Sequence, residues 1–183
     1  MKKIILPSFV IALTLWMWQF VSFAAANLHS GGQQYTEHQD TITAFINSLN
    51  LADGEYLIPQ VDPKKPDMKM EDWNQYYGKP WMFLKYYNNR EDVMGMNMIR
   101  GFSSNWIAGF IIIYLLNMMG SMSRIKSILT TLGMGLVVFI YVPYTNHIWF
   151  PDFDTVMTLL DCLIPFALIG VWNGLFWNKV NRD

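Results

Sequence analysis

Long apolar stretches alternate with polar segments along the chain, and four of these stretches are long enough to cross a membrane. A helix needs about 20 mostly apolar residues to span a bilayer core of roughly 30 Å. Asp161 is the one acidic or basic residue within the four stretches, which are residues 4–26, 102–119, 127–144 and 155–177. The pattern therefore predicts four membrane-spanning helices.

Composition agrees with a membrane protein and excludes several other classes. Of the 183 residues 52% are hydrophobic and 15% are charged, whereas a soluble domain carries about 25% charged residues. A net charge of -1 gives no basic footprint for nucleic acid. Cys162 is the one cysteine, so the sequence holds no intrachain disulfide and no cysteine-based zinc motif.

The first stretch has two interpretations. Lys2 and Lys3 precede it and Ala24, Ala25 and Ala26 close it, which is also the pattern of a cleaved signal peptide. Its apolar run of about 20 residues exceeds the 7–15 that are usual for a signal peptide, and this length favours a retained membrane anchor.

Basic residues near the ends of the spans predict the orientation, because short cytoplasmic segments are rich in Lys and Arg. The short segment 145–154 contains neither residue type. Both termini are therefore expected in the cytoplasm, with residues 27–101 and 145–154 outside. The basic residues that support this are Lys2, Lys3, Arg124, Lys126, Lys179 and Arg182.

The segment between the first two spans shows order of its own. Apolar residues recur at helical spacing in residues 35–49, and residues 55–59 and 81–87 have the composition of strands. We expect an all-α membrane protein with a small α+β extracytoplasmic cap between helices 1 and 2. The predicted parts are an anchor at 1–26, the cap at 27–101 and a three-helix region at 102–183.

The order of these features resembles an uncharacterised family of small four-span bacterial inner-membrane proteins. The residues that carry the resemblance are Leu28–Ser30 after an aromatic first span, Glu37, and the stretch GEYLIP at 54–59. The resemblance implies a bacterial cytoplasmic membrane and supplies no catalytic residues.

Asp161 is the sharpest candidate for a functional residue, because a carboxylate within a span must be paired, protonated or in contact with water. Counting depth along antiparallel helices places Tyr141, Gln19 and Ser22 near it. Two interpretations stay open. The cluster is a proton or cation site or a contact with a partner helix, or it is a hydrogen-bonded part of the bundle.

Met94, Met96 and Met98 form a second candidate site, since thioethers are ligands that select Cu(I). On a strand all three would share a face, whereas on a helix Met94 and Met98 would. Packing near the membrane entry is the alternative. The histidines His29, His38 and His147 could form a metal site with Glu37, but their spacing matches no metal motif, so exposed or hydrogen-bonded side chains are the ordinary interpretation.

Gly170 and Gly174 form a GxxxG pattern in the fourth span. Such a pattern permits close approach of two membrane helices. The contact is either inside the bundle, with Gly133 and Gly135 as its counterpart, or between two copies of the chain.

The sequence contains none of the common catalytic motifs. We therefore predict a protein that is not an enzyme and needs no cofactor: an accessory or assembly subunit in the lipid bilayer that presents its cap to an envelope protein or to a second copy. The alternative is a protein that handles protons, cations or Cu(I) through Asp161 or the three methionines.

Overall fold

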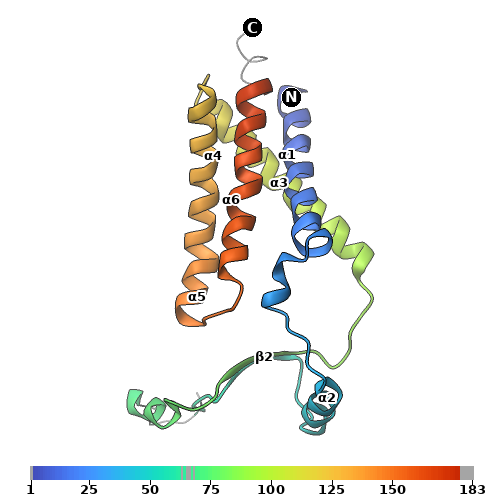
Figure 1. Ribbon diagram of the computed structural model, residues 1–183, viewed down its shortest axis with the longest axis vertical. Helices are drawn as coiled ribbons and strands as arrows, with labels where there is room; N and C mark the ends of the chain where they lie inside the picture. The colour runs from blue at the N-terminus through green and yellow to red at the C-terminus, as the bar shows by residue number, and fades with distance from the viewer. Residues whose placement is uncertain (1, 63, 65–66, 68, 178–183) are drawn as a thin grey trace. The chain divides into compact units, whose positions relative to one another are not determined.

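The computed structural model describes residues 2–62, 64, 67 and 69–177, so Lys179 and Arg182 lie outside the described part. The chain forms two compact units (Figure 1). The helical unit comprises the described residues up to Gln34 and from Val93 onward, and the cap unit comprises those of Tyr35–Asp92.

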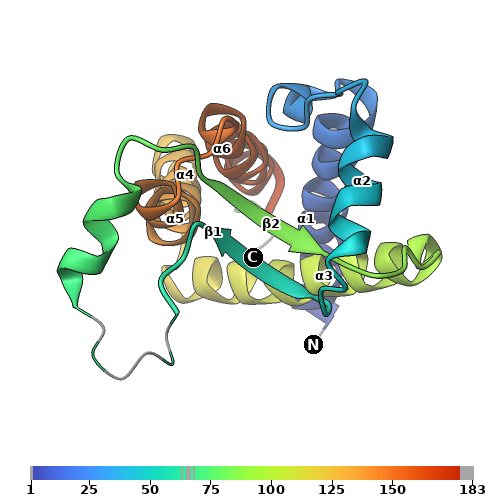
Figure 2. The ribbon, with the colours of Figure 1, turned by 90° about the horizontal axis from the view of Figure 1, so that it is seen from below.

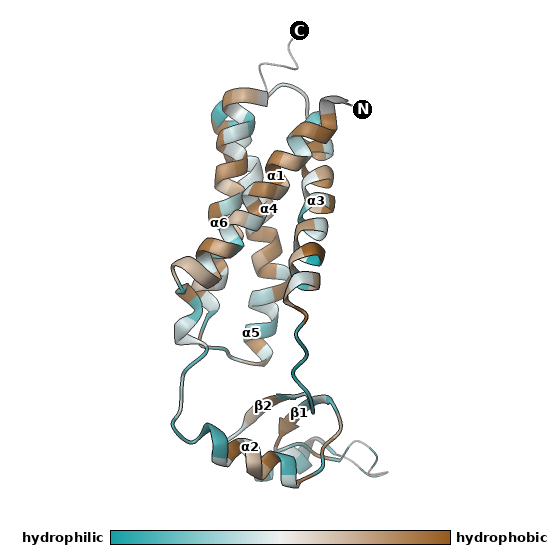
Figure 3. Cartoon of the chain, turned by 90° about the vertical axis from the view of Figure 1, so that its right-hand side faces the viewer, coloured by the Kyte–Doolittle hydropathy of each residue, from teal (hydrophilic) through white to brown (hydrophobic). Residues whose placement is uncertain are grey.

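Four helical stretches of the helical unit are long and apolar enough to cross a membrane, as the hydrophobic pattern predicts: Ile4–Ala25, Met94–Met118, Arg124–Trp149 and Thr155–Phe176. Figure 3 shows apolar colour along each of them. Their elements are α1 (Lys2–Phe20) with η1 (Val21–Ala25), α3 (Met94–Met118), α4 (Arg124–Phe139) with η4 (Ile140–Tyr144) and α5 (Thr145–Trp149), and α6 (Thr155–Trp172) with η5 (Asn173–Trp177).

The helices pack as two close pairs, α1 with α3 and α4 with α6, and the pairs meet where α1 lies beside α6 (Figure 1). Buried isoleucines fill the centre, among them Ile11, Ile113 and Ile169. A Cβ added to Gly109 of α3 would lie 2.5 Å from the carbonyl oxygen of Ser8, so the lack of a side chain there lets α3 approach α1 closely.

The two ends of the helical unit differ in what they contain. At one end, here called the His29 end, α1 finishes, α3 and α6 begin, and the short 3-10 turn η2 (Leu28–Gly31) follows Asn27. At the other end, here called the Arg124 end, α1 begins and the turn between α3 and α4 lies near η5. The hydroxyl of Ser123 caps α4 by accepting a hydrogen bond from the N–H of Lys126 (3.3 Å).

Three of the long helical stretches contain a π-helical turn: η1 and η5 close theirs, whereas η4 is followed by α5. A π turn holds more residues than an α turn, so side chains after it point in directions that α-helical counting does not give. The predicted outer segment 145–154 begins with the helical turn α5, which continues from η4, and so it is a loop only after Trp149.

The cap unit contains the helix α2 (Gln39–Ser48), the strands β1 (Gly54–Ile58) and β2 (Met82–Tyr86), and the 3-10 turn η3 (Met70–Tyr76). The strands pair antiparallel, with Gly54 opposite Tyr86 and Ile58 opposite Met82 (Figure 2). The Tyr86 hydroxyl donates to the Asn47 side chain (2.9 Å), which joins the hairpin to α2.

The compact cap is narrower than the predicted range 27–101. Turn η2 belongs to the helical unit, and α3 begins at Met94. The predicted helix 35–49 is shorter by four residues at its start because residues up to His38 lie in a turn, in which the Thr36 hydroxyl accepts from the N–H of His38 (3.2 Å).

Candidate functional site

Asp161, on the second turn of α6, accepts hydrogen bonds from three side chains. Trp18 Nε1 (2.9 Å) and Ser22 Oγ (2.6 Å) donate to Oδ1. The third contact joins His29 Nε2 to Oδ2 (2.9 Å). Trp18 and Ser22 lie four residues apart, so both face α6 from the same side of the first span. A carboxylate within a span is thus surrounded by donors.

His29 reaches this carboxylate because the chain turns back immediately after the first span. Asn27 has a positive φ of 46°, a left-handed conformation that Asn tolerates better than most residues. The turn η2 that follows places the imidazole of His29 flat against the ring of Phe23, with 3.9 Å between ring centroids and 7° between planes. The histidine is consequently buried between η1 and α6.

The other ring nitrogen of His29, Nδ1, contacts Oδ2 of Asp154, the residue immediately before α6. Asp154 and Asp161 are seven residues apart, which is two helical turns, so both carboxylates lie on the face of α6 that meets the first span. A Cβ added to Gly32 would lie 3.0 Å from Cβ of Asp154, and the glycine therefore leaves room for this carboxylate.

Burial opposes protonation of His29, but the hydrogen bond and charge of Asp154, together with the charge of Asp161, outweigh it. The pKa of His29 is therefore raised above the ordinary value of a histidine. Since the site lies at a helix end and Asp154 remains partly exposed to water, a proton can reach it without crossing the apolar interior.

Ser22, His29 and Asp154 contact one another in the same order as the serine, histidine and aspartate of a catalytic triad. The serine nevertheless lacks two properties that a nucleophile requires. Ser22 is fully buried, so no substrate can approach its hydroxyl. Its proton is directed to Asp161 (2.6 Å), while its contact with His29 Nε2 is longer (3.0 Å). The histidine therefore does not act as a base toward this hydroxyl.

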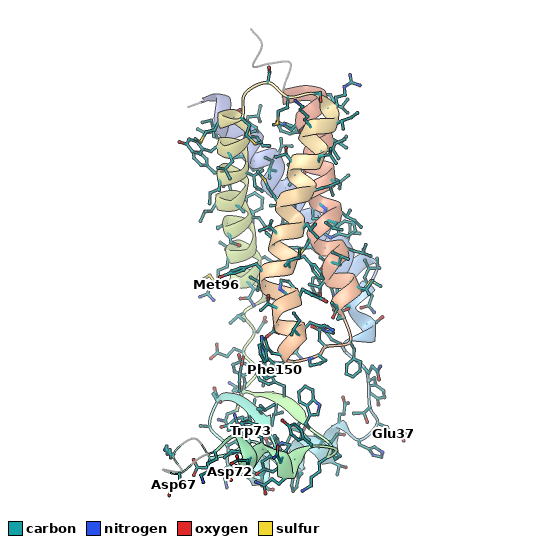
Figure 4. The ribbon with its side chains drawn as sticks, turned by 90° about the vertical axis from the view of Figure 1, so that its left-hand side faces the viewer. Glu37, Asp67, Asp72, Trp73, Met96 and Phe150 are labelled. Carbon is teal, nitrogen blue, oxygen red and sulfur yellow. The ribbon has the colours of Figure 1, made fainter. Side chains whose placement is uncertain are left out.

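The described residues contain no group of three His, Cys, Asp or Glu side chains arranged to hold a metal ion. In the cluster, the two nitrogens of His29 already face two different carboxylates. The methionines of the copper hypothesis lie at the start of α3, where Figure 4 labels Met96. On a helix Met94 and Met98 share a face that Met96 does not.

Two members of the predicted Asp161 cluster lie elsewhere. Gln19 accepts a hydrogen bond from Asn105 of α3 (3.2 Å), because it is one position past Trp18 and so about 100° further round the helix. Tyr141, in η4, is 79% exposed. It lies two positions after the buried Phe139, so it points to nearly the opposite side of the helix. Ser22 is the predicted member that contacts Asp161.

The GxxxG glycines pack inside the helical unit, against α4. A Cβ on Gly170 would lie 2.7 Å from Cα of Ile128, and a Cβ on Gly174 would lie 3.0 Å from Cα of Arg124. Of the expected counterparts, Gly135 approaches the carbonyl of Cys162, whereas a Cβ on Gly133 would meet nothing within 4 Å.

A smaller polar group lies beside the cluster in the loop before α6. His147 Nδ1 accepts from the N–H of Asp152 (3.2 Å) and contacts the Thr155 hydroxyl (2.6 Å). Burial raises the pKa of Asp152, but the Thr155 hydroxyl, the N–H of Asp154 and His147 outweigh it, so that this pKa is lowered. The third histidine, His38, precedes α2 in the cap unit.

Sequence reasoning missed His29, Asp154 and Trp18 as partners of Asp161. One signal was present: Asp154 is spaced two full turns from Asp161, and His29 follows the first span by a few residues. What the sequence did not show was the reversal at Asn27, which returns His29 to the helices.

Comparison with known proteins adds no relative. No protein-family model matches the chain, and no curated protein or solved structure matches it. The resemblance to four-span bacterial inner-membrane proteins stays a prediction.

Proposed function

We propose that this protein is a non-catalytic, multi-pass accessory protein of the bacterial cytoplasmic membrane that presents its cap unit to a partner in the envelope. In this proposal all four long helical stretches cross the membrane, both termini are cytoplasmic, and the His29 end faces the outside. The observation that carries it is the large apolar surface of the small cap unit.

Large apolar side chains of the cap unit remain open to solvent. The exposed fraction is 64% for Phe45, 70% for Tyr87, 49% for Trp81 and 44% for Phe83. Soluble units rarely expose apolar side chains in such density unless another surface covers them. A two-stranded hairpin is also marginally stable in water by itself. Both arguments favour a protein that binds the cap.

The alternative, cation transport through Asp161, has less support. Both oxygens of Asp161 already contact side chains of the protein, namely Trp18, Ser22 and His29. A metal cation would have to displace these partners. The Cu(I) alternative would rest on Met94 and Met98, the pair that shares a face of α3.

Site-specific photo-crosslinking in the native membrane tests the proposal. A photoreactive phenylalanine analogue at Phe83 or Phe45 is expected to give one discrete crosslinked protein, whose added mass separates a different partner from a second copy. The same analogue at Glu37 or Gln75, which are exposed polar positions of the same unit, is the matched control. Equal labelling at all four positions, or labelling of lipid alone, would reject the accessory function.

Packing also favours retention of the first span. Ser8, Ile11 and Ala12 are fully buried in the helical unit, and cleavage after Ala26 would remove the Trp18 and Ser22 donors from Asp161. We expect an intact mass near 21.3 kDa for the purified chain. A mass that lacks residues 1–26 would show a cleaved signal peptide and a bundle of three spans.

A further inference from the structure

The contacts of His29 fix the number of protons in the cluster. Nδ1 faces a carboxylate oxygen of Asp154, and Nε2 faces Asp161 Oδ2 at 2.9 Å. Ser22 also lies near Nε2, but its hydrogen points to Asp161 Oδ1 at 2.6 Å. Both ring nitrogens therefore face acceptors. A neutral imidazole carries one N–H and can donate one hydrogen bond. Hydrogen bonds at both nitrogens therefore require one additional proton, beyond those of a neutral histidine and two ionised carboxylates.

We infer that Asp154, His29 and Asp161 form a proton-binding site, and that the bound proton fastens the turn Leu28–Gly31 to the beginning of α6. The site is independent of what binds the cap unit, because each of its groups belongs to the helical unit.

The groups that surround the imidazole favour a positive charge. From α6 and the residue before it come the carboxylates of Asp161 and Asp154, and both pair with His29. From α1 and η1 come uncharged groups: the Trp18 indole donates to Asp161, the Ser22 hydroxyl contacts Nε2, and the Phe23 ring stacks on the imidazole. An aromatic face also attracts a cation.

The neighbouring titratable groups do not supply the positive charge that would balance the carboxylates of Asp154 and Asp161. Asp152 accepts from the N–H of Asp154 (3.0 Å) and so adds negative charge on that side. His147 contacts Asp152 and Thr155 in the adjoining loop, with Nδ1 accepting a hydrogen bond. Cys162 follows Asp161 in α6 and is half-buried. The imidazolium is thus the cation that both carboxylates contact.

The carboxylates, and not the imidazole, reach the surface of the helical unit. The side chain of His29 is 6% exposed, whereas those of Asp154 and Asp161 are 24% and 20% exposed. In this proposal the proton therefore exchanges through the carboxylates, at the His29 end.

The same proton connects two segments that local structure leaves separate. The backbone hydrogen bonds around η2 are local, from Ser30 N to Asn27 O and from Gly32 N to His29 O. The side chain of His29 is what joins this turn to α6. When the proton leaves, one ring nitrogen presents a lone pair to a carboxylate, and this contact becomes repulsive. The ring then lies between two carboxylates that it can no longer pair with at the same time. The turn Leu28–Gly31 is therefore released from α6.

The direction of the pH dependence follows from the raised pKa of His29. A proton held more tightly in the folded protein stabilises the closed turn at every pH below the unfolded value of about 6.5. This contribution is lost as the pH rises through the pKa of the folded state. The fastening is therefore closed below about pH 6.5 and opens as the pH rises above that value.

Nitrogen NMR of the full-length protein, labelled with ¹⁵N in histidine and held in lipid nanodiscs, tests the proton count directly. We expect one histidine to keep the doubly protonated imidazolium signature to a titration midpoint above about pH 6.5, and its signal to disappear in His29→Gln. His38→Gln is the matched control and should leave that signal in place. Loss of the second proton from His29 with a midpoint at or below about pH 6.5 would overturn the inference without any variant in the cluster.

A spin label on Ser30→Cys in a Cys162→Ala background tests the fastening. The label should be immobile at about pH 5.5 and become mobile with a midpoint above about pH 6.5, and Asp154→Asn should lower that midpoint. The same label on Ser103→Cys of α3 should show no transition. A label on Ser30→Cys that stays immobile from pH 5 to pH 10, or a transition that persists in His29→Gln, would contradict the fastening. Neither readout depends on a partner of the cap.

Discussion

The two ends of α6 meet their neighbours through different chemistry. At the His29 end, α6 contacts the first span through charged and aromatic side chains that surround one histidine. At the Arg124 end, it meets α4 through small uncharged groups. There the Asn173 side chain donates to the Ser127 hydroxyl (2.8 Å), which donates to the carbonyl of Gly170 (3.0 Å).

This difference separates two ways of holding apolar helices together. Close backbone approach at Gly170 gives packing and hydrogen bonds between neutral groups, which a change of pH does not remove. The strength of the His29 cluster instead depends on charge and on a proton. The contact of α6 with α4 is therefore expected to be independent of pH, whereas its contact with the first span is expected to depend on pH.

The largest effect is expected from Asp161→Ala. This change leaves the imidazolium of His29, the Trp18 N–H and the Ser22 hydroxyl without their shared acceptor. Breaking a mostly buried ion pair in this way costs about 3 kcal/mol. Unfolding in mixed detergent at pH 7 measures it, and the gap to wild type should shrink at alkaline pH. A constant gap would mean that the charge of His29 plays no part.

Gly170→Leu should cost about 2 kcal/mol by overpacking, because its Cβ would meet Thr131 Oγ1 at 2.3 Å and Ile128 Cα at 2.7 Å. Gly133→Leu on α4 is the matched control, since a Cβ there meets nothing within 4 Å. Thermal unfolding in detergent should separate the two variants at every pH. If both variants melt at the wild-type temperature, the α4–α6 contact is not tight.

The pH profile of stability should have two limbs of opposite sign. The alkaline limb comes from His29, whose raised pKa means that its stabilisation is lost as the pH rises through that pKa. The acid limb comes from Asp152, whose lowered pKa means that its stabilisation is present above about pH 3.9 and lost as the pH falls through the folded value. His29→Gln should flatten the alkaline limb and leave the acid limb; flattening of neither limb would refute this assignment.

Asn27→Val should destabilise the turn by about 1 kcal/mol, because a β-branched residue is strained at a φ of 46°. Asn27→Gly accepts that conformation and should stay close to wild type. The spin label on Ser30→Cys compares them: mobility should rise in the valine variant. Equal mobility would show that the left-handed turn does not position His29.

The smallest effect is expected from Glu55→Gln in the cap hairpin. Glu55 pairs with Lys85 at 2.9 Å, similar to the distance from His29 to Asp161, but both side chains are more than half exposed. Exposed pairs contribute little to stability. Chemical denaturation should not distinguish this variant from wild type, and a clear loss would show that the hairpin is covered in the folded protein.

The sequence predicts the elements better than their partners. Hydrophobic length alone located the four long helices, and strand composition located both cap strands. Of the three partners predicted for Asp161, one, Ser22, contacts it, because depth counting finds residues at one level but not their direction around a helix. Gln19 points to α3 and Tyr141 points outward for that reason. His29 required a chain reversal that one asparagine sets.

The order of the segments along the chain has a consequence for how the cluster assembles. Trp18, Ser22 and His29 precede Asp161 by more than 130 residues. Ser22 and His29 can contact each other as soon as the turn after Asn27 has formed. The Trp18 indole N–H, in contrast, gains its acceptor only when α6 packs against α1. The cluster is therefore completed by a long-range contact, after the local turn.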